Sequence, residues 1–233
     1  GMGIGYAGGL GVVLLSLGMG MFPGQIPWDV ILIIMSAIAA ICALQLAGGL
    51  DYLVRIAENI LRKNPKHINY LAPTVTYFLT ILAGTGHTAF SMIPVIVEVA
   101  KSENIKPSVP LSIAVVASQI GITASPVSAA VVAMSGFLEP FGVSYPTLLG
   151  ICISTTFIAV MITAFIMSTF ANNDLSSDPV YQERLAAGHV APPREKNVDF
   201  HLKPGAKKSV LIFLIGIICI VFYATAISKN IGI

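Results

Sequence analysis

The chain has 233 residues, of which 55% are hydrophobic and only 10% are charged, and its mean hydropathy is +0.85. Soluble domains carry about 25% charged residues, so this composition excludes an ordinary water-soluble fold and favours a protein embedded in a lipid bilayer. The net charge of +2 without a basic patch argues against nucleic acid as a partner. The three cysteines have neither disulfide-framework nor zinc-ligand spacing, so we expect no metal site.

Six long apolar stretches follow one another along the chain. Each is long enough for a helix that crosses a bilayer, which takes about 20 residues. Because helices satisfy their own backbone hydrogen bonds in lipid, we predict an all-α, polytopic membrane protein. An apolar stretch is already under way at residue 1, so we expect the sequence to be a piece of a longer protein. The stretches are Gly1–Phe22, Trp28–Ala47, Leu71–Val99, Val109–Leu138, Thr147–Ala171 and Val210–Ile227.

Residues 48–70, between the second and third stretches, have an amphipathic pattern. Apolar side chains from Leu50 to Leu61 fall on one helical face, and charged or amide side chains from Arg55 to Lys63 fall on the other. This pattern predicts a helix that lies along the membrane surface. We expect Asp51 to cap its start and Asn64-Pro65 to end it.

The third stretch, residues 71–99, contains Gly84-Thr85-Gly86 at its middle, where two glycines permit a sharp reversal. The positions of the 13 lysines and arginines favour such a reversal. If every stretch crosses the bilayer, the basic residues show no clear bias, whereas a returning third stretch places twelve of the 13 on one side. Cytoplasmic loops are enriched in Lys and Arg, so we predict a re-entrant helical hairpin that opens to the cytoplasm.

The fourth stretch, residues 109–138, is also interrupted. Small polar residues from Thr123 to Ser128 break an otherwise apolar run, and Ser125-Pro126 has the form of a helix cap followed by proline at the first helical position. We predict a helix that ends near Ile122, a short unwound piece, and a new helix that starts at Pro126. Irregular backbone at this depth is tolerated only where protein covers it or where it lines a cavity.

Two helix N-termini would therefore end near the bilayer centre, each with unpaired N–H groups and about half a positive charge. Such ends bind anions, and broken helices that meet at the midplane are the usual substrate site of secondary transporters. The alternatives are a packing role for the glycines, a simple kink at Ser125-Pro126, and a packing role for His87. The candidate substrate-binding residues are Thr85, Gly86, His87, Thr88, Thr123, Ser125, Pro126 and Ser128, with Gln119 and Ser118 as secondary candidates.

Residues 172–208 form the one long polar segment. Ser177-Asp178-Pro179 opens a short helix there and Gly188 closes it, and the remainder has the composition of a linker without assigned chemistry. The predicted organisation is scaffold helices at 1–47, an interfacial helix at 48–70, a re-entrant hairpin at 71–99, a broken transmembrane helix at 109–138, a transmembrane helix at 147–171, a cytoplasmic loop at 172–208 and a further transmembrane helix at 209–229.

At these motifs the sequence resembles the anaerobic C4-dicarboxylate (Dcu) transporter family, and within it the A-type branch. The resemblance extends over nearly the whole chain, and the joint set of motifs is specific. The matching runs are Gln45–Asp51, Leu61–Lys66, Thr80–His87, Thr123–Val132, Asp178–Tyr181 and Gly205–Ser209.

The resemblance implies exchange or uptake of fumarate, malate, succinate and aspartate across the bacterial inner membrane during anaerobic growth. It also implies that this chain is the N-terminal half of a protein about twice as long, built like an ion transporter from inverted repeats that work as an elevator. In that scheme, Thr85, Gly86 and His87 stand at the hairpin tip, Thr123, Ser125 and Ser128 lie at the broken-helix loop, and the helix at 51–63 joins scaffold to transport domain.

Two alternatives to this function stay open: transport of another small organic anion, and a dicarboxylate-sensing membrane partner that does not transport. No membrane segment carries a catalytic motif, so we do not expect an enzyme. We expect no cofactor, with H⁺ or Na⁺ as a coupling ion. The expected partners are small dicarboxylate anions and the lipid bilayer, with a homo-oligomer and a sensor kinase as further candidates.

Overall fold

The structure is a computed structural model that describes residues 2–20, 28–86, 88–171, 174–190 and 203–223. Throughout these residues the regular structure is helical, as the composition predicts, and the one pairing between extended residues is an isolated bridge between Ile105 and Asp174. The α-helices are α1 (Met2–Met19), α2 (Trp28–Leu46), α3 (Gly49–Lys63), α4 (Ile68–Ala83), α5 (Thr88–Ser102), α6 (Ser108–Gly121), α7 (Ala129–Leu138), α8 (Tyr145–Phe170), α9 (Pro179–Ala186) and α10 (Ala206–Phe222). Short 3₁₀ turns lie at Pro65–His67, Ile122–Ala124 and Glu139–Phe141.

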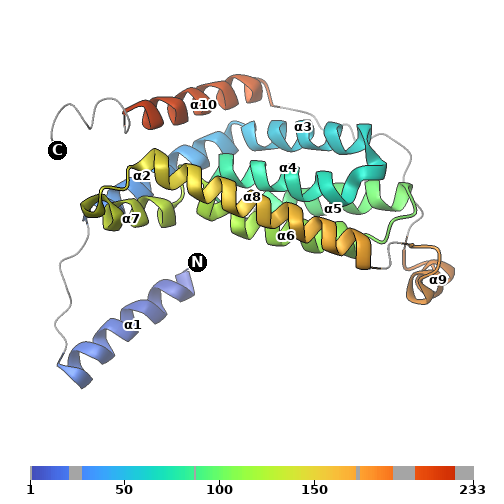
Figure 1. Cartoon of the computed structure of the whole chain (residues 1–233), viewed down its shortest axis with the longest axis horizontal. Helices are drawn as coiled ribbons and strands as arrows, with labels where there is room; N and C mark the ends of the chain where they lie inside the picture. Colours follow the sequence, from blue (N-terminus) through green and yellow to red (C-terminus); the bar gives the residue numbers. More distant parts are fainter. Residues whose placement is uncertain (1, 21–27, 87, 172–173, 191–202, 224–233) are drawn as a thin grey trace.

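Helix α4 lies at the centre of the bundle, with α3, α5, α6 and α8 around it (Figure 1). The contact with α6 is the closest, because Gly121 lets the two backbones approach: a Cβ on Gly121 would lie 3.2 Å from the Tyr77 carbonyl oxygen and 3.3 Å from Thr80 Cβ. The main core is apolar and is shared by α3, α4, α5 and α6. Its fully buried members include Leu61, Ile68, Ala72, Met92, Ile96 and Val99.

Helices α2 and α3 meet at a sharp corner and are bent by 69° relative to each other. The corner is made by Gly48, whose φ of 76° is a left-handed conformation that favours glycine. Gly48, and not Asp51, is therefore the N-cap of α3, so the prediction for Asp51 was wrong. Asp51 instead lies in the first turn, where a carboxylate is favoured by the helix dipole.

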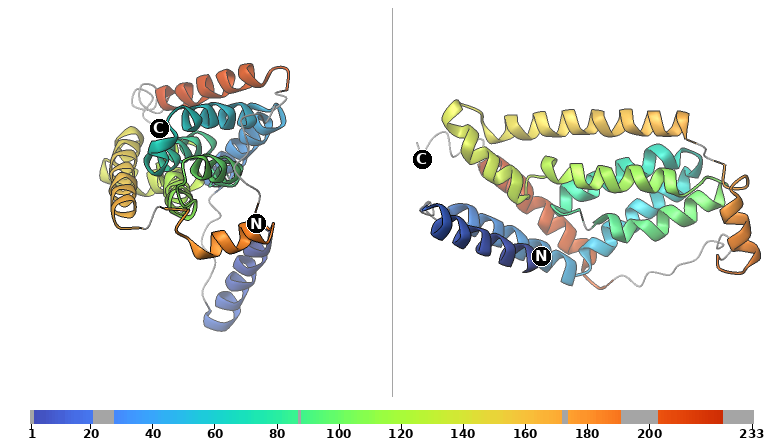
Figure 2. Two further views of the ribbon diagram at one scale, coloured as in Figure 1. Left: turned by 90° about the vertical axis from the view of Figure 1, so that its right-hand side faces the viewer. Right: turned by 90° about the horizontal axis from the view of Figure 1, so that it is seen from below.

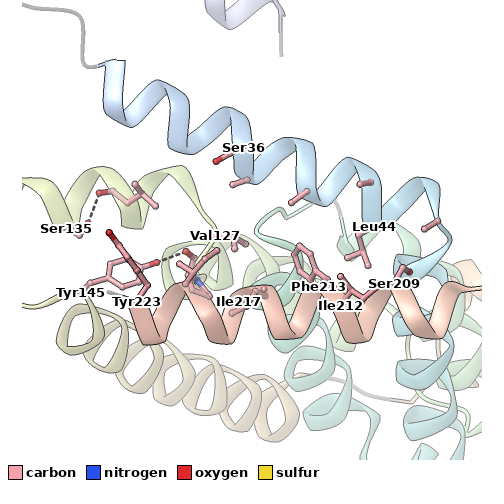
Figure 3. A pocket seen from close by; sticks show the side chains of 18 residues that line it. Ser36, Leu44, Val127, Ser135, Tyr145, Ser209, Ile212, Phe213, Ile217 and Tyr223 are labelled. Carbon is pink, nitrogen blue, oxygen red and sulfur yellow. Dashed lines mark hydrogen bonds between the residues drawn. The ribbon is translucent and has the colours of Figure 1, made fainter. Parts of the chain in front are cut away.

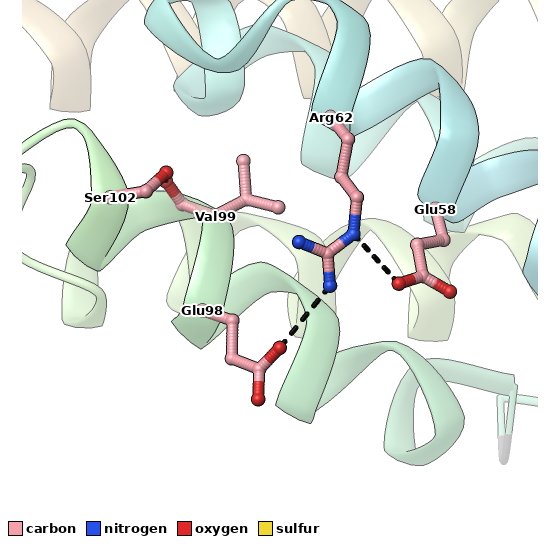
Figure 4. A network of polar contacts seen from close by, with 5 residues as sticks. All are labelled: Glu58, Arg62, Glu98, Val99 and Ser102. Atoms are coloured by element: carbon pink, nitrogen blue, oxygen red, sulfur yellow. Dashed lines mark hydrogen bonds and ion pairs between the residues drawn. The ribbon is translucent and has the colours of Figure 1, made fainter. Parts of the chain in front are cut away.

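The amphipathic pattern of α3 predicted that its polar face would lie at the surface, but part of that face contacts another helix. Arg62 donates from Nε to Glu58 at 2.8 Å and from a terminal nitrogen to Glu98 of α5 at 3.2 Å (Figure 4). Glu58 is buried, and Arg62 and Glu98 are about a quarter exposed. The arginine thus connects α3 to the second arm of the hairpin, a contact between residues 36 positions apart that helical periodicity does not reveal.

Among the described helices, α8 is long and apolar enough by itself to cross a membrane, and the bent pair α2–α3 meets the same criterion only if both helices count as one span. We expected further membrane-crossing helices within residues 1–47 and 209–229, and the described parts of these stretches do not meet the criterion by themselves. Glycine, proline and small polar residues divide two of the stretches, so their helices are shorter than the apolar runs. Large apolar side chains along one face of α8, such as Ile151, Ile158 and Phe165, are exposed. Helix α1 lies apart from the other helices, and almost all its described side chains are exposed (Figures 1 and 2).

The segment from Asp174 to α9 is docked on the turn between α5 and α6. Leu175 is buried and donates its N–H to the Asn104 carbonyl at 3.0 Å, and Lys106 pairs with Asp178. Asp178 also caps α9, as predicted, by accepting from the N–H groups of Val180 and Tyr181. Residues 174–186 are therefore more than a linker. Lys106 and these N–H groups also hold the pKa of Asp178 below its usual value.

Candidate functional site

The first element of the candidate site is the interruption between α4 and α5. Helix α4 ends at Ala83, and Gly84 adopts a φ of 64° while its N–H donates to the Thr80 carbonyl at 2.8 Å. Helix α5 begins at Thr88, so the two glycines reverse the chain as the sequence predicted. The Thr80 and Thr88 hydroxyls share a hydrogen bond of 2.8 Å across the reversal, which connects the two arms inside the protein. The predicted residue His87 lies outside the described residues.

The second element is the interruption between α6 and α7. Helix α6 ends at Gly121, a 3₁₀ turn follows, and residues 125–128 leave the helical path before α7 begins at Ala129. The prediction that Ser125 caps a helix starting at Pro126 was wrong. Ser128 is the N-cap, because its backbone is extended and its hydroxyl accepts from Val131 N–H at 3.3 Å. The extended backbone at Ser125 (ψ 129°) instead turns this serine toward α4.

The two interruptions meet. Ser125 Oγ donates to the Ile81 carbonyl at 2.7 Å, and Ile81 lies in the last turn of α4, where carbonyls lack a helical partner. A Cβ on Gly84 would lie 2.7 Å from Val127 Cγ2, so the hairpin tip rests against the unwound piece. A Cβ on Gly86 would lie 2.5 Å from Gln119 Nε2, which places the α6 amide against the same tip.

The described site residues divide by exposure into three groups. Gly86, Thr88, Ser118, Ser125 and Ser128 are buried; Thr85 and Pro126 are half-buried; Gln119 and Thr123 are exposed.

The buried hydroxyls bond to groups of the protein itself. Ser118 Oγ donates to the Val115 carbonyl at 2.8 Å, and Thr88 Oγ1 donates to the Thr85 carbonyl at 3.2 Å. The exposed Thr123 Oγ1 also donates internally, to the Ile120 carbonyl at 2.7 Å, which leaves its oxygen lone pairs as acceptors only. The buried hydroxyls thus fix the two interruptions in place, while Gln119, Thr123 and Thr85 are the polar side chains that a ligand could reach.

Two residues that stabilise the site, Thr80 and Tyr145, were not predicted from the sequence. Thr80 lies eight residues before its partner Thr88, on the other arm of the hairpin, and a hairpin prediction with facing arms could have found this pair. Tyr145, at the start of α8, donates its hydroxyl to the Pro126 carbonyl. Nothing in the local sequence marks that contact, because 19 residues and the whole of α7 separate the two groups.

In the described part of the broken helix, the positive charge that an anion would meet comes from the backbone. No Lys or Arg occurs between Lys106 and Arg184, so no cationic side chain of that part of the sequence can balance an anion there. Helix α7 directs its N-terminus at the unwound piece, and such an end carries about half a positive charge. Four of the nearby amides, those of Val127, Ser128, Val131 and Val132, are already bonded inside the chain. The described residues hold no cluster of three or more His, Cys, Asp or Glu side chains that could bind a metal.

A separate groove of about 950 Å³ lies beside the unwound piece, between α2, α7 and α10 (Figure 3). Pro126 and Val127 form part of its wall, but the remaining lining is mostly alanine, isoleucine and other apolar side chains. Such a lining does not compensate the desolvation of a dianion. The groove is therefore a poorer candidate for an anion site than the meeting point of the two interruptions.

The whole chain matches one protein family. Residues 1–232 match the model of the anaerobic C4-dicarboxylate membrane transporters. This chain belongs to that family. Relatives named C4-dicarboxylate transporter DcuA are 69% identical in Wolinella succinogenes, 64% in Helicobacter pylori and 53% in Escherichia coli, each over 233 residues. The resemblance read from the motifs is thereby confirmed, and family membership makes this a membrane protein.

The alignments cover 100% of this chain but only 53%, 52% and 53% of those three relatives, so the chain spans about half the length of the curated transporters it matches. No solved structure matches it. The family description names C4-dicarboxylate membrane transporters.

Proposed function

We propose that this chain contributes a substrate-binding half-site to a secondary transporter of C4-dicarboxylates such as fumarate, malate, succinate and aspartate in the bacterial inner membrane. The observation that carries the proposal is the meeting of two helix interruptions, joined by the bond from Ser125 Oγ to the Ile81 carbonyl. Irregular backbone within a membrane is tolerated where protein covers it or where it lines a polar cavity, and paired interruptions are typical of transporter sites.

In this proposal α4 and α5 form a re-entrant hairpin that opens to the cytoplasm, and α6 and α7 form the broken span. The dipole of α7 attracts one carboxylate, and the exposed amide of Gln119 together with Thr85 at the hairpin tip binds the polar atoms of the substrate. The buried serines and threonines position these groups rather than contact the substrate. Exchange, or coupling to H⁺ or Na⁺, drives the movement of one transport body against a scaffold.

The family resemblance and the charge distribution support the orientation. In this topology, twelve of the 13 lysines and arginines lie on the side of the membrane to which the hairpin opens. Cytoplasmic loops are enriched in Lys and Arg, so that side is the cytoplasm. The second half of the site, and any oligomer or sensor partner, belongs to the full-length protein.

The test is uptake of labelled fumarate by the full-length transporter in proteoliposomes. We expect Thr85→Ala and Ser125→Ala each to reduce uptake several-fold with normal membrane insertion. Ser125→Ala removes the donor to the Ile81 carbonyl, and an unsatisfied buried carbonyl costs about 1–3 kcal/mol. Ser154→Ala is the matched control, because Ser154 is exposed on α8 and bonds only the Gly150 carbonyl of its own helix. Unchanged uptake in both site variants would remove the assigned site.

A further inference from the structure

Tyr145 is the first residue of α8, and its hydroxyl reaches back to the unwound piece. It donates to the Pro126 carbonyl, and the dashed line at Tyr145 in Figure 3 marks this bond. The ring packs at the same time against a small apolar cluster formed by Val131 of α7 and by Leu148 and Leu149 of α8. Ring and hydroxyl therefore have separate contacts, and the hydroxyl can be removed without removing the packing.

The Pro126 carbonyl needs a donor from outside the unwound piece. Within that piece, the Ser125 carbonyl accepts from Ser128 N–H at 3.2 Å, and the Ser128 carbonyl accepts from Val132 N–H at 3.2 Å. Pro126 precedes the start of α7, so its carbonyl lies outside the helical ladder. A backbone carbonyl away from water costs free energy unless it is paired, and Tyr145 supplies the pair from a different helix.

The unwound piece is consequently held from two sides. Ser125 connects it to the end of α4, and Tyr145 connects the next residue to the start of α8. Val127, the residue after these two anchored positions, carries the methyl group against which the hairpin tip rests at Gly84. A shift of Pro126 would therefore change how the unwound piece meets the tip.

We propose that Tyr145 is a positioning residue for the candidate substrate site: its hydroxyl fixes the Pro126 carbonyl, and through it the place where the broken helix meets the hairpin tip. This inference rests on the proposed function of the two interruptions. It assigns no contact between Tyr145 and the substrate.

The experiment compares Tyr145→Phe with Ser144→Ala in the full-length transporter. Ser144 is the neighbouring residue, and its hydroxyl bonds Thr147 at the same helix start without reaching the unwound piece. We expect Tyr145→Phe to raise the KM for fumarate by about three- to tenfold, the equivalent of one lost hydrogen bond, while the maximal rate per inserted transporter changes by less than about twofold. Ser144→Ala should leave both unchanged.

The outcomes separate this inference from the proposed function. A normal KM in Tyr145→Phe together with impaired Ser125→Ala and Thr85→Ala would overturn the positioning role and leave the site intact. A lower maximal rate with unchanged KM would also overturn it. Normal uptake in all three variants would overturn the proposed function itself.

A second measurement does not depend on transport. With Val127→Cys as a reporter in a background whose native cysteines are replaced by serine, Tyr145→Phe should increase the rate of thiol labelling several-fold, because the unwound piece is released on one side. Equal labelling rates with and without the tyrosine hydroxyl would show that it does not hold this segment.

Discussion

The helices from α3 to α6 and the outer surfaces of α1, α8 and α10 are all rich in apolar residues, but they use their small and polar residues differently. In the inner group, glycines make close contacts at Gly84, Gly86 and Gly121, and the hydroxyls of Thr80, Thr88 and Ser125 are buried and bonded between segments. In the outer group, a Cβ added at Gly8, Gly150 or Gly216 would meet nothing.

Hydroxyls show the same contrast. On the outer face of α8, Ser154, Thr155 and Thr163 are exposed and bond only carbonyls one turn earlier in their own helix. A serine or threonine in an apolar helix is therefore no evidence of a site by itself. What distinguishes Thr80, Thr88 and Ser125 from these exposed hydroxyls is that they bond across segments, which a hydropathy pattern does not reveal.

The inner group and the outer surfaces should differ most in their response to the substitution of a glycine by alanine. Gly84→Ala places a side chain in a left-handed conformation, at a cost of about 1–2 kcal/mol, and forces it against Val127. We expect a loss of about tenfold or more in fumarate uptake by the full-length transporter, with a loss of stability of roughly 2–4 kcal/mol once the overpacking is included.

Gly150→Ala on α8 is the control for this substitution. It adds the same methyl group in open space within a helix, where alanine is favoured over glycine. Uptake and stability should stay at or above the original level. Similar losses at both positions would contradict the division between a tightly packed inner group and an open outer surface.

The positions of the two helix interruptions could be predicted from the sequence, because their causes are local. Gly84 and Gly86 permit the reversal, and Pro126 interrupts the second helix because it has no N–H for the helical ladder and its ring clashes with the preceding turn. The helix that follows Asp178 was likewise predicted from a cap and a proline, and the structure has it at α9.

Helix starts were less predictable, since several residues compete for the same role. Both Ser125 and Ser128 can cap a helix, and only the bond from Ser125 to the Ile81 carbonyl, 44 residues earlier, decides that Ser128 does so. The same limit applies to Arg62, which satisfies a local i,i+4 pair with Glu58 and also reaches Glu98 on another helix. Contacts of this kind depend on how helices are arranged, and periodicity describes only each helix by itself.

A smaller effect is expected when a single hydroxyl is replaced without a change of shape. Thr80→Val removes the bond to Thr88 in the buried centre of the hairpin, and we expect a loss of about 1 kcal/mol in stability. Thr163→Val on the exposed face of α8 removes only a bond to the Ala159 carbonyl of its own helix and should change stability by less than about 0.5 kcal/mol. Denaturation followed by tryptophan fluorescence or by SDS titration measures both. A larger effect at Thr163 would reverse the assignment of inner and outer surfaces.

The smallest effect should appear at the water-exposed edge of the inner group, where Asp178 pairs with Lys106. This pairing and the N–H groups of α9 lower the pKa of Asp178 from its ordinary value of 3.8. The ion pair therefore stabilises the docking of residues 174–186 fully above pH 3.8, and this stabilisation is lost as the pH falls through the lower pKa of the docked state. Hydrogen exchange of Leu175 N–H, which bonds Asn104 in the docked segment, should therefore lose protection below about pH 4 after correction for intrinsic rates. Asp178→Asn should weaken protection at neutral pH and reduce this dependence, and the remainder comes from Asp174, whose carboxylate accepts from Ser176 and Asn104 and also has a lowered pKa. Glu183→Gln, at an exposed acid on the same helix, should retain the full dependence. If Asp178→Asn keeps full protection, the ion pair contributes nothing to docking, and the buried Leu175 side chain together with the bridge at Ile105 is sufficient to hold this segment on the α5–α6 turn.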